Sequence, residues 1–139
     1  MPKRKGQYKK PRYKLFKAFV AGFTPPALVL SILLPIVLYF NVQVQYLYIV
    51  PLAPMVWGLW NFFYIENINW YPAKHHLGVV GAFLGFILAV FSVFIIKAPQ
   101  ALGFTGDYIY LSLIATPIFY YATWHATVHK LNRLFGIHD

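Results

Sequence analysis

Histidine is the residue type in this sequence best suited to chemistry, and four of the five histidines form two close groups. His125 and His129 are four residues apart, so they share one face of a helix. His75 and His76 are adjacent, shortly after Glu66. Histidines at i and i+4 commonly bind metal, so the less favoured interpretation of these five side chains is a zinc-type metal site. The alternative is a set of membrane-edge histidines that contact headgroups, water and helix C-terminal carbonyls.

Other reactive groups are scarce. The chain has no cysteine, which excludes a thiolate nucleophile, a disulfide and a cysteine-ligated metal or iron–sulfur cluster. The only acids are Glu66, Asp107 and Asp139, far apart in the sequence, and no Gly-rich phosphate loop or pair of carboxylates is present. A transmembrane haem would need histidines deeper in the apolar segments. We therefore expect no cofactor, and the sequence argues against an enzyme.

The histidines and acids must be held in place by helices formed from the long apolar stretches of the chain. Of the 139 residues, 60% are hydrophobic and only 11% are charged, against about 25% charged in an ordinary soluble domain. Lipid must therefore solvate much of the surface. We predict an all-α membrane fold in one domain, 13–139, after a basic cytoplasmic tail, 1–12. Its four transmembrane helices are expected at about 27–40, 46–65, 77–96 and 108–128.

Residues 13–23 leave two interpretations open. Their apolar residues recur at helical spacing with lysines on the other side, which predicts a short amphipathic helix in the membrane interface. Thr24-Pro25-Pro26 then predicts the start of the first transmembrane helix, because Thr can cap and Pro is tolerated in a first turn. The alternative is that 13–23 are simply the first turns of that helix, with snorkelling lysines.

Basic residues set the predicted orientation. Eight of the twelve Lys and Arg residues precede the first apolar segment and are expected to contact an anionic cytoplasmic leaflet. They are Lys3, Arg4, Lys5, Lys9, Lys10, Arg12, Lys14 and Lys17. With four spans and a cytoplasmic N-terminus, Lys74, Lys130 and Arg133 are also inside, and Lys97 alone is outside. The positive-inside rule thus predicts a multi-pass protein of the cell membrane with both termini cytoplasmic. Nucleic acid is the less favoured partner of the tail.

Two side-chain patterns concern the spans themselves. Gly81, Gly85 and Ala89 are spaced by four on the third span, which predicts close helix packing against either an internal helix or another protomer. A polar face on the fourth span predicts either interhelical hydrogen bonds or the lining of a hydrophilic path. Its residues are Ser112, Thr116, Tyr120, Thr123 and Thr127.

These features favour a non-enzymatic accessory, assembly or scaffold component, with a second copy or other membrane proteins as partners. No predicted span contains Asp, Glu, Lys or Arg, and ion-coupled transporters usually need such a charge. An oligomeric channel or transporter for a small solute remains one alternative. A metal-dependent enzyme at the membrane edge, built on His125 and His129, is the other.

Overall fold

A computed structural model describes residues 12–39, 49–67, 77–101 and 103–137. Within these ranges every regular element is helical, which confirms the all-α prediction for the part of the chain described. The elements are α1 (Arg12–Tyr39), α2 (Leu52–Asn67), α3 (Leu77–Phe91), η2 (Ser92–Ile96), α4 (Ala98–Ala101), η3 (Gly106–Leu111), α5 (Ser112–Thr123), η4 (Trp124–Val128) and α6 (His129–Leu134).

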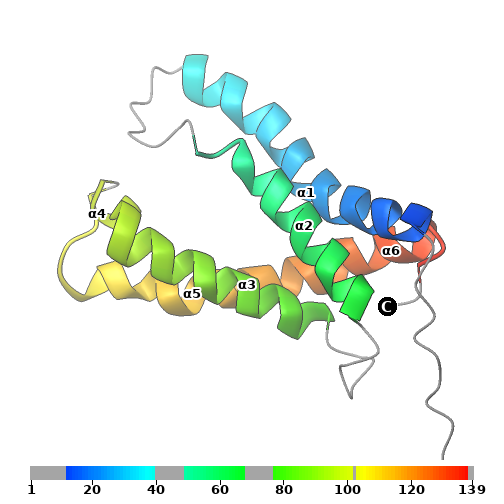
Figure 1. The fold of residues 1–139 in the computed structure, drawn as a ribbon. Helices are drawn as coiled ribbons and strands as arrows, with labels where there is room; N and C mark the ends of the chain where they lie inside the picture. The colour runs from blue at the N-terminus through cyan, green and yellow to red at the C-terminus, as the bar shows by residue number, and fades with distance from the viewer. Residues whose placement is uncertain (1–11, 40–48, 68–76, 102, 138–139) are drawn as a thin grey trace, which may run out of the picture.

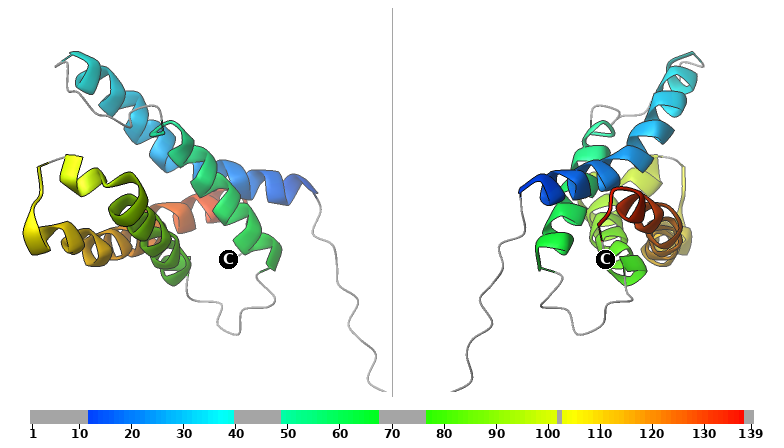
Figure 2. Two further views of the ribbon diagram at one scale, coloured as in Figure 1. Left: turned by 60° about the vertical axis from the view of Figure 1, so that its left-hand side comes forward. Right: turned by 90° about the vertical axis from the view of Figure 1, so that its right-hand side faces the viewer.

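The first helix joins the segment 13–23 to the apolar segment that follows it. α1 runs without interruption from Arg12 to Tyr39. The helix start expected at Thr24 is therefore wrong, and the alternative, in which 13–23 are the first turns of the same helix, is confirmed. Thr24 does not cap; its hydroxyl donates to the Val20 carbonyl one turn earlier, at 2.7 Å. Pro25 and Pro26 remove two backbone donors inside the helix, which bends it rather than ending it. Figure 2 shows this bend: the start of α1 runs in a different direction from its later turns.

The second helix begins later than predicted. α2 starts at Leu52 rather than near 46, since residues 49–51 form a turn in which Leu52 N–H donates to Ile49 O at 2.9 Å. Pro51 cannot donate to a helical ladder and Pro54 fits only in a first turn, so the helix starts between them.

The third and fourth apolar segments behave differently. α3 and η2 together form the helix Leu77–Ile96, with the bounds expected of the third span. The fourth segment is a run of consecutive helical pieces, η3, α5, η4 and α6, which passes the predicted end near 128 and continues to Leu134. η4 is a wider, single π-helical turn inside this run.

The helices form two antiparallel hairpins. α1 packs on α2, and α3 packs on α5. Figure 1 shows the hairpins converging where α1 begins and α6 ends, and diverging towards α4. At the converging end α1 also contacts η4 and α6. The buried core gathers there, with Trp57, Tyr64, Ile65, Leu77, Leu84, Trp124, Val128 and Ile137 among its residues.

Two of the helices, Arg12–Tyr39 and Leu77–Ile96, are long and apolar enough to cross a membrane. Neither is enclosed by the rest of the molecule: only 11% and 28% of their apolar windows are buried. A core helix of a soluble protein is mostly buried, so this exposure favours a membrane as the environment of both helices.

Candidate functional site

A buried pair of amides joins the two hairpins. Asn61 of α2 and Asn132 of α6 are both fully buried. Asn61 Nδ2 donates to Asn132 Oδ1 at 2.9 Å, and Asn132 Nδ2 donates back to Asn61 Oδ1 at 3.3 Å. Asn61 Nδ2 also donates to the Ala18 carbonyl of α1 at 2.7 Å. Because a buried amide without partners costs about 1–3 kcal/mol, these bonds fix three helices in one register.

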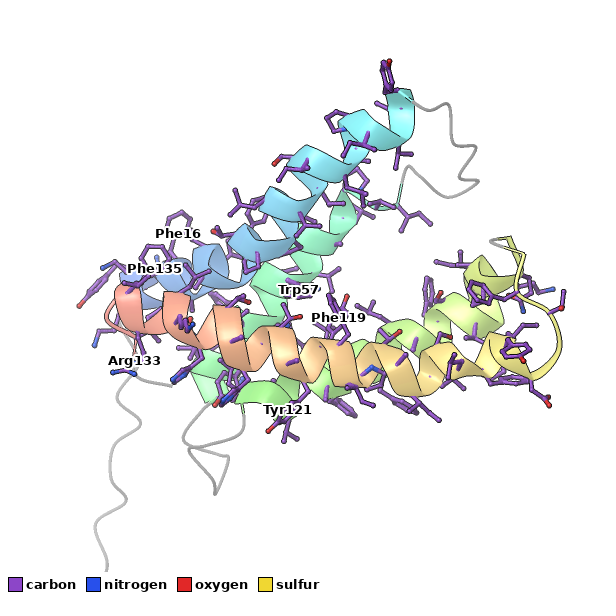
Figure 3. All side chains as sticks on the ribbon, turned by 180° about the vertical axis from the view of Figure 1, so that it is seen from behind. Phe16, Trp57, Phe119, Tyr121, Arg133 and Phe135 are labelled. Atoms are coloured by element: carbon purple, nitrogen blue, oxygen red, sulfur yellow. The ribbon has the colours of Figure 1, made fainter. Side chains whose placement is uncertain are left out.

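An aromatic layer lies beside this amide pair. Trp57 Nε1 donates to the Tyr120 hydroxyl at 3.1 Å, and the Trp57 ring packs on both Tyr120 and Trp124 at centroid distances of 4.9 and 5.7 Å. Trp60 Nε1 donates to the Val80 carbonyl of α3 at 3.0 Å. Figure 3 shows Trp57 between the two hairpins, facing the helix that carries Tyr121. The layer therefore connects α2 to both helices of the other hairpin.

The third tryptophan of this layer, Trp124, differs from Trp57 and Trp60 in its hydrogen bonding. Its side chain is fully buried, and its indole Nε1 is the one buried side-chain polar atom without a hydrogen-bond partner among the described residues. Its position is set by packing, because the ring lies directly over Gly81: a Cβ built on Gly81 would come within 2.3 Å of Trp124 Cγ.

The small residues of α3 face α5 within the same chain. A Cβ on Gly85 would lie 2.8 Å from Tyr120 Cβ, and Ala89 is 1% exposed. The hairpin of α1 and α2 uses the same device at Gly22 and Gly58: a Cβ on Gly22 would meet Trp57 O at 2.5 Å. Sequence reasoning missed these two glycines, although a glycine inside an apolar helix was the available signal.

The hydroxyls of the predicted polar face are largely used inside their own helix. Ser112, Thr123 and Thr127 each donate to a carbonyl three or four residues earlier, at 3.1, 2.8 and 2.6 Å. Tyr120 accepts from Trp57, and the Thr116 carbonyl lies beside Gly85. Among the described hydrogen bonds of this face, the one to Tyr120 is of the interhelical kind that was predicted, whereas those of Ser112, Thr123 and Thr127 are local. The hydrophilic path stays a prediction.

The described histidines form a row with Tyr121. The rings of Tyr121 and His125 are nearly parallel at 6.2 Å, and those of His125 and His129 at 6.3 Å. His125 is exposed and His129 half-buried. His75 and His76 lie outside the described residues, and Glu66 is exposed at the end of α2. Within the described ranges no group of three or more His, Cys, Asp or Glu residues could hold a metal ion.

Basic residues collect where the two hairpins converge. Arg12, Lys14 and Lys17 lie in the first turns of α1, and Lys130 and Arg133 lie in α6. These five residues are named the basic end below. Lys17 Nζ donates to the Phe135 carbonyl at 3.5 Å, and Figure 3 places Phe16, Phe135 and Arg133 at this end of the molecule. Lys97, the remaining basic residue described, lies between η2 and α4 at the far end. The tail residues Lys3, Arg4, Lys5, Lys9 and Lys10 lie outside the described residues.

No protein-family model, curated protein or solved structure matches the chain.

Proposed function

We propose that the chain is a four-span protein of the cell membrane, with both termini cytoplasmic, that acts as a non-enzymatic accessory or scaffold component by packing its exposed helix surfaces against other membrane helices. The observation that carries this proposal is the surface of α1 beyond its bend, where large apolar side chains have between 45% and 67% of their area exposed. They are Leu28, Val29, Ile32, Leu33, Ile36 and Leu38. Soluble monomers rarely expose an apolar patch of this extent.

The internal polar groups support the same proposal. Asn61, Asn132, Trp57 and Tyr120 hold the helices to one another, so they do not provide a reactive group facing solvent. The internal hydrogen bonds hold the helices in fixed positions, and the exposed apolar helix faces are then available to pack against other membrane helices. The clustering of five of the six described basic residues at the converging end supports a cytoplasmic location for that end.

The topology can be tested without background labelling, because the chain has no cysteine. Single cysteines at Glu66 and Arg133 should react with a membrane-impermeant maleimide only after cells are opened. Cysteines at Lys97 and Asp107 should react in intact cells. Labelling of Arg133→Cys in intact cells contradicts the proposed orientation. Equal labelling of all four variants in intact cells contradicts membrane insertion.

The packing role has its own experiment. Cysteines at Ile32 and Ile36 should form cross-links to a second copy or to another membrane protein when native membranes are oxidised. A cysteine at Asp107, exposed in the first turn of η3, is the matched control and should form few cross-links. Absence of any specific adduct at both α1 positions, with the protein expressed at its natural level, contradicts the packing role.

A further inference from the structure

We propose that the basic end and the apolar side chains interleaved with it form one composite surface for the phosphates of anionic phospholipid headgroups. This inference rests on the proposed membrane location. It goes beyond a basic N-terminal tail because it assigns α6 an equal share in the surface. The two helices that build it are distant in sequence and are brought together only by the fold, since Lys17 and Phe135 are 118 positions apart.

Among the described residues, no acid neutralises the charges of this surface. None of the five cations of the basic end forms an ion pair with another described residue. The first turn of α1 contains no acid, yet it contains Arg12 and Lys14. Cations at a helix N-terminus are repelled by the helix dipole, so local stability disfavours them there. An external anion, such as a row of headgroup phosphates, offsets this electrostatic repulsion.

Large apolar side chains accompany the cations. Tyr13 and Phe16 of α1 are 60% and 66% exposed, and Leu134 at the end of α6 is 80% exposed. Stable attachment to a membrane surface requires both apolar insertion and electrostatic attraction to anionic lipid. An inorganic or nucleotide phosphate would use the cations alone and would leave these three side chains in water. The mixture of both kinds of group therefore selects a lipid surface as the occupant.

The two halves of the surface are fixed relative to each other. Lys17 donates to the Phe135 carbonyl, and the Asn61–Asn132 pair holds α6 against α1 through Ala18. The end of α6 is closed by Gly136, whose φ of 71° allows Ile137 N–H to donate back to Asn132 O at 2.8 Å. A preorganised surface loses less entropy on binding than a flexible tail does, so α6 should contribute to affinity even when the tail is intact.

The experiment is native mass spectrometry of the full chain in a neutral detergent, titrated with phosphatidylglycerol or with phosphatidylcholine of the same acyl chains. We expect the wild type to prefer phosphatidylglycerol. Each cation near an anionic surface contributes about fivefold in affinity, so Lys130→Gln/Arg133→Gln should weaken phosphatidylglycerol binding about 25-fold. Binding of phosphatidylcholine should change little.

Two controls separate the sources of binding. Lys97→Asn removes one charge at the far end, and Asn suits the left-handed backbone at that position, where φ is 56°. This variant should bind lipid like the wild type. Leu134→Gln should weaken the binding of both lipids, because it removes an apolar contact without changing charge.

Three results overturn the proposal. They are equal affinity of the wild type for both lipids, unchanged phosphatidylglycerol binding in Lys130→Gln/Arg133→Gln, and competition by inorganic phosphate at concentrations similar to those of the lipid. The last result identifies a site for free anions instead. Loss of lipid preference does not affect the maleimide labelling pattern, so a failure of this inference is distinguishable from a failure of the proposed membrane topology.

Discussion

Asn61 and Asn132 exchange hydrogen bonds through both of their side-chain amides while fully buried, although 71 positions separate them in the chain. Each amide supplies a donor and an acceptor, so the pair satisfies itself only when α2 and α6 have the register seen here. In an apolar environment few other partners are available. The pair therefore selects one arrangement of the two hairpins over arrangements that apolar packing alone would tolerate.

Replacing either asparagine should destabilise the fold, because each substitution leaves a buried partner without its hydrogen bond. Asn61→Leu removes the bonds to Asn132 and to Ala18, so it should cost about 1–3 kcal/mol. Asn132→Leu leaves the Asn61–Ala18 bond in place but leaves the buried Asn61 Oδ1 without its Asn132 donor, so it should cost a similar amount. Reversible unfolding of the purified protein in mixed micelles measures both changes.

The double variant Asn61→Leu/Asn132→Leu completes the cycle. Because it removes both buried amides together, it should be less destabilised than the sum of the single variants. Strict additivity of the two changes contradicts the reciprocal pairing.

The sequence predicted that the chain is helical better than it predicted where each helix begins and ends. Apolar content predicted an all-helical chain, and the bounds 77–96 matched because that segment contains neither proline nor charge. The start of α1 stayed open between two interpretations, because Thr24-Pro25-Pro26 has the same local signature in a helix start and in a bent helix. In the structure Ala18, Ala21 and Gly22 are buried within the continuous helix, and Gly22 lies close to Trp57 and Asn61 of α2.

The site was less predictable than the elements. Asn61 is recognisable from sequence as a polar residue in an apolar segment. Its partner Asn132 lies among charged residues, where one more polar residue does not stand out. Pairing between distant segments depends on how the hairpins cross, which no local periodicity encodes. The same applies to Trp57 and Tyr120.

Gly81→Ala should destabilise the hairpin of α3 and α5. Alanine gains up to about 1 kcal/mol of helix propensity over glycine. However, its Cβ would lie 2.3 Å from Trp124 Cγ, and the buried Trp124 side chain has little room to move. Overpacking of this kind costs about 1–3 kcal/mol, so the clash should prevail. The same unfolding measurement tests it.

Val79→Leu provides the matched control for Gly81→Ala. Val79 lies on the same helix and is 50% exposed, so the larger side chain has room and stability should be unchanged. A Gly81→Ala protein as stable as the wild type contradicts the close approach of Trp124 to α3.

Ile137 should matter more for stability than Leu134, although both are aliphatic residues at the same helix end. Ile137 is 3% exposed and packs into the core after the Gly136 turn, whereas Leu134 is 80% exposed. Ile137→Ala should cost about 2–5 kcal/mol in the range of buried aliphatic truncations. Leu134→Ala should have almost no effect on unfolding in detergent. Equal effects of the two variants contradict the docking of the chain after α6.

Metal binding at the histidine row should be weak. His125 and His129 have parallel rings 6.3 Å apart, and two histidines supply fewer protein ligands than the three or four of a zinc site. We therefore expect detergent-purified protein to lose added Zn²⁺ on gel filtration, with the same metal content in wild type and in His125→Ala/His129→Ala. Elemental analysis of both proteins measures this content. Stoichiometric zinc in the wild type that disappears in the double variant contradicts this expectation. That result favours further ligands from His75, His76 or Glu66, and with them the metal-dependent alternative.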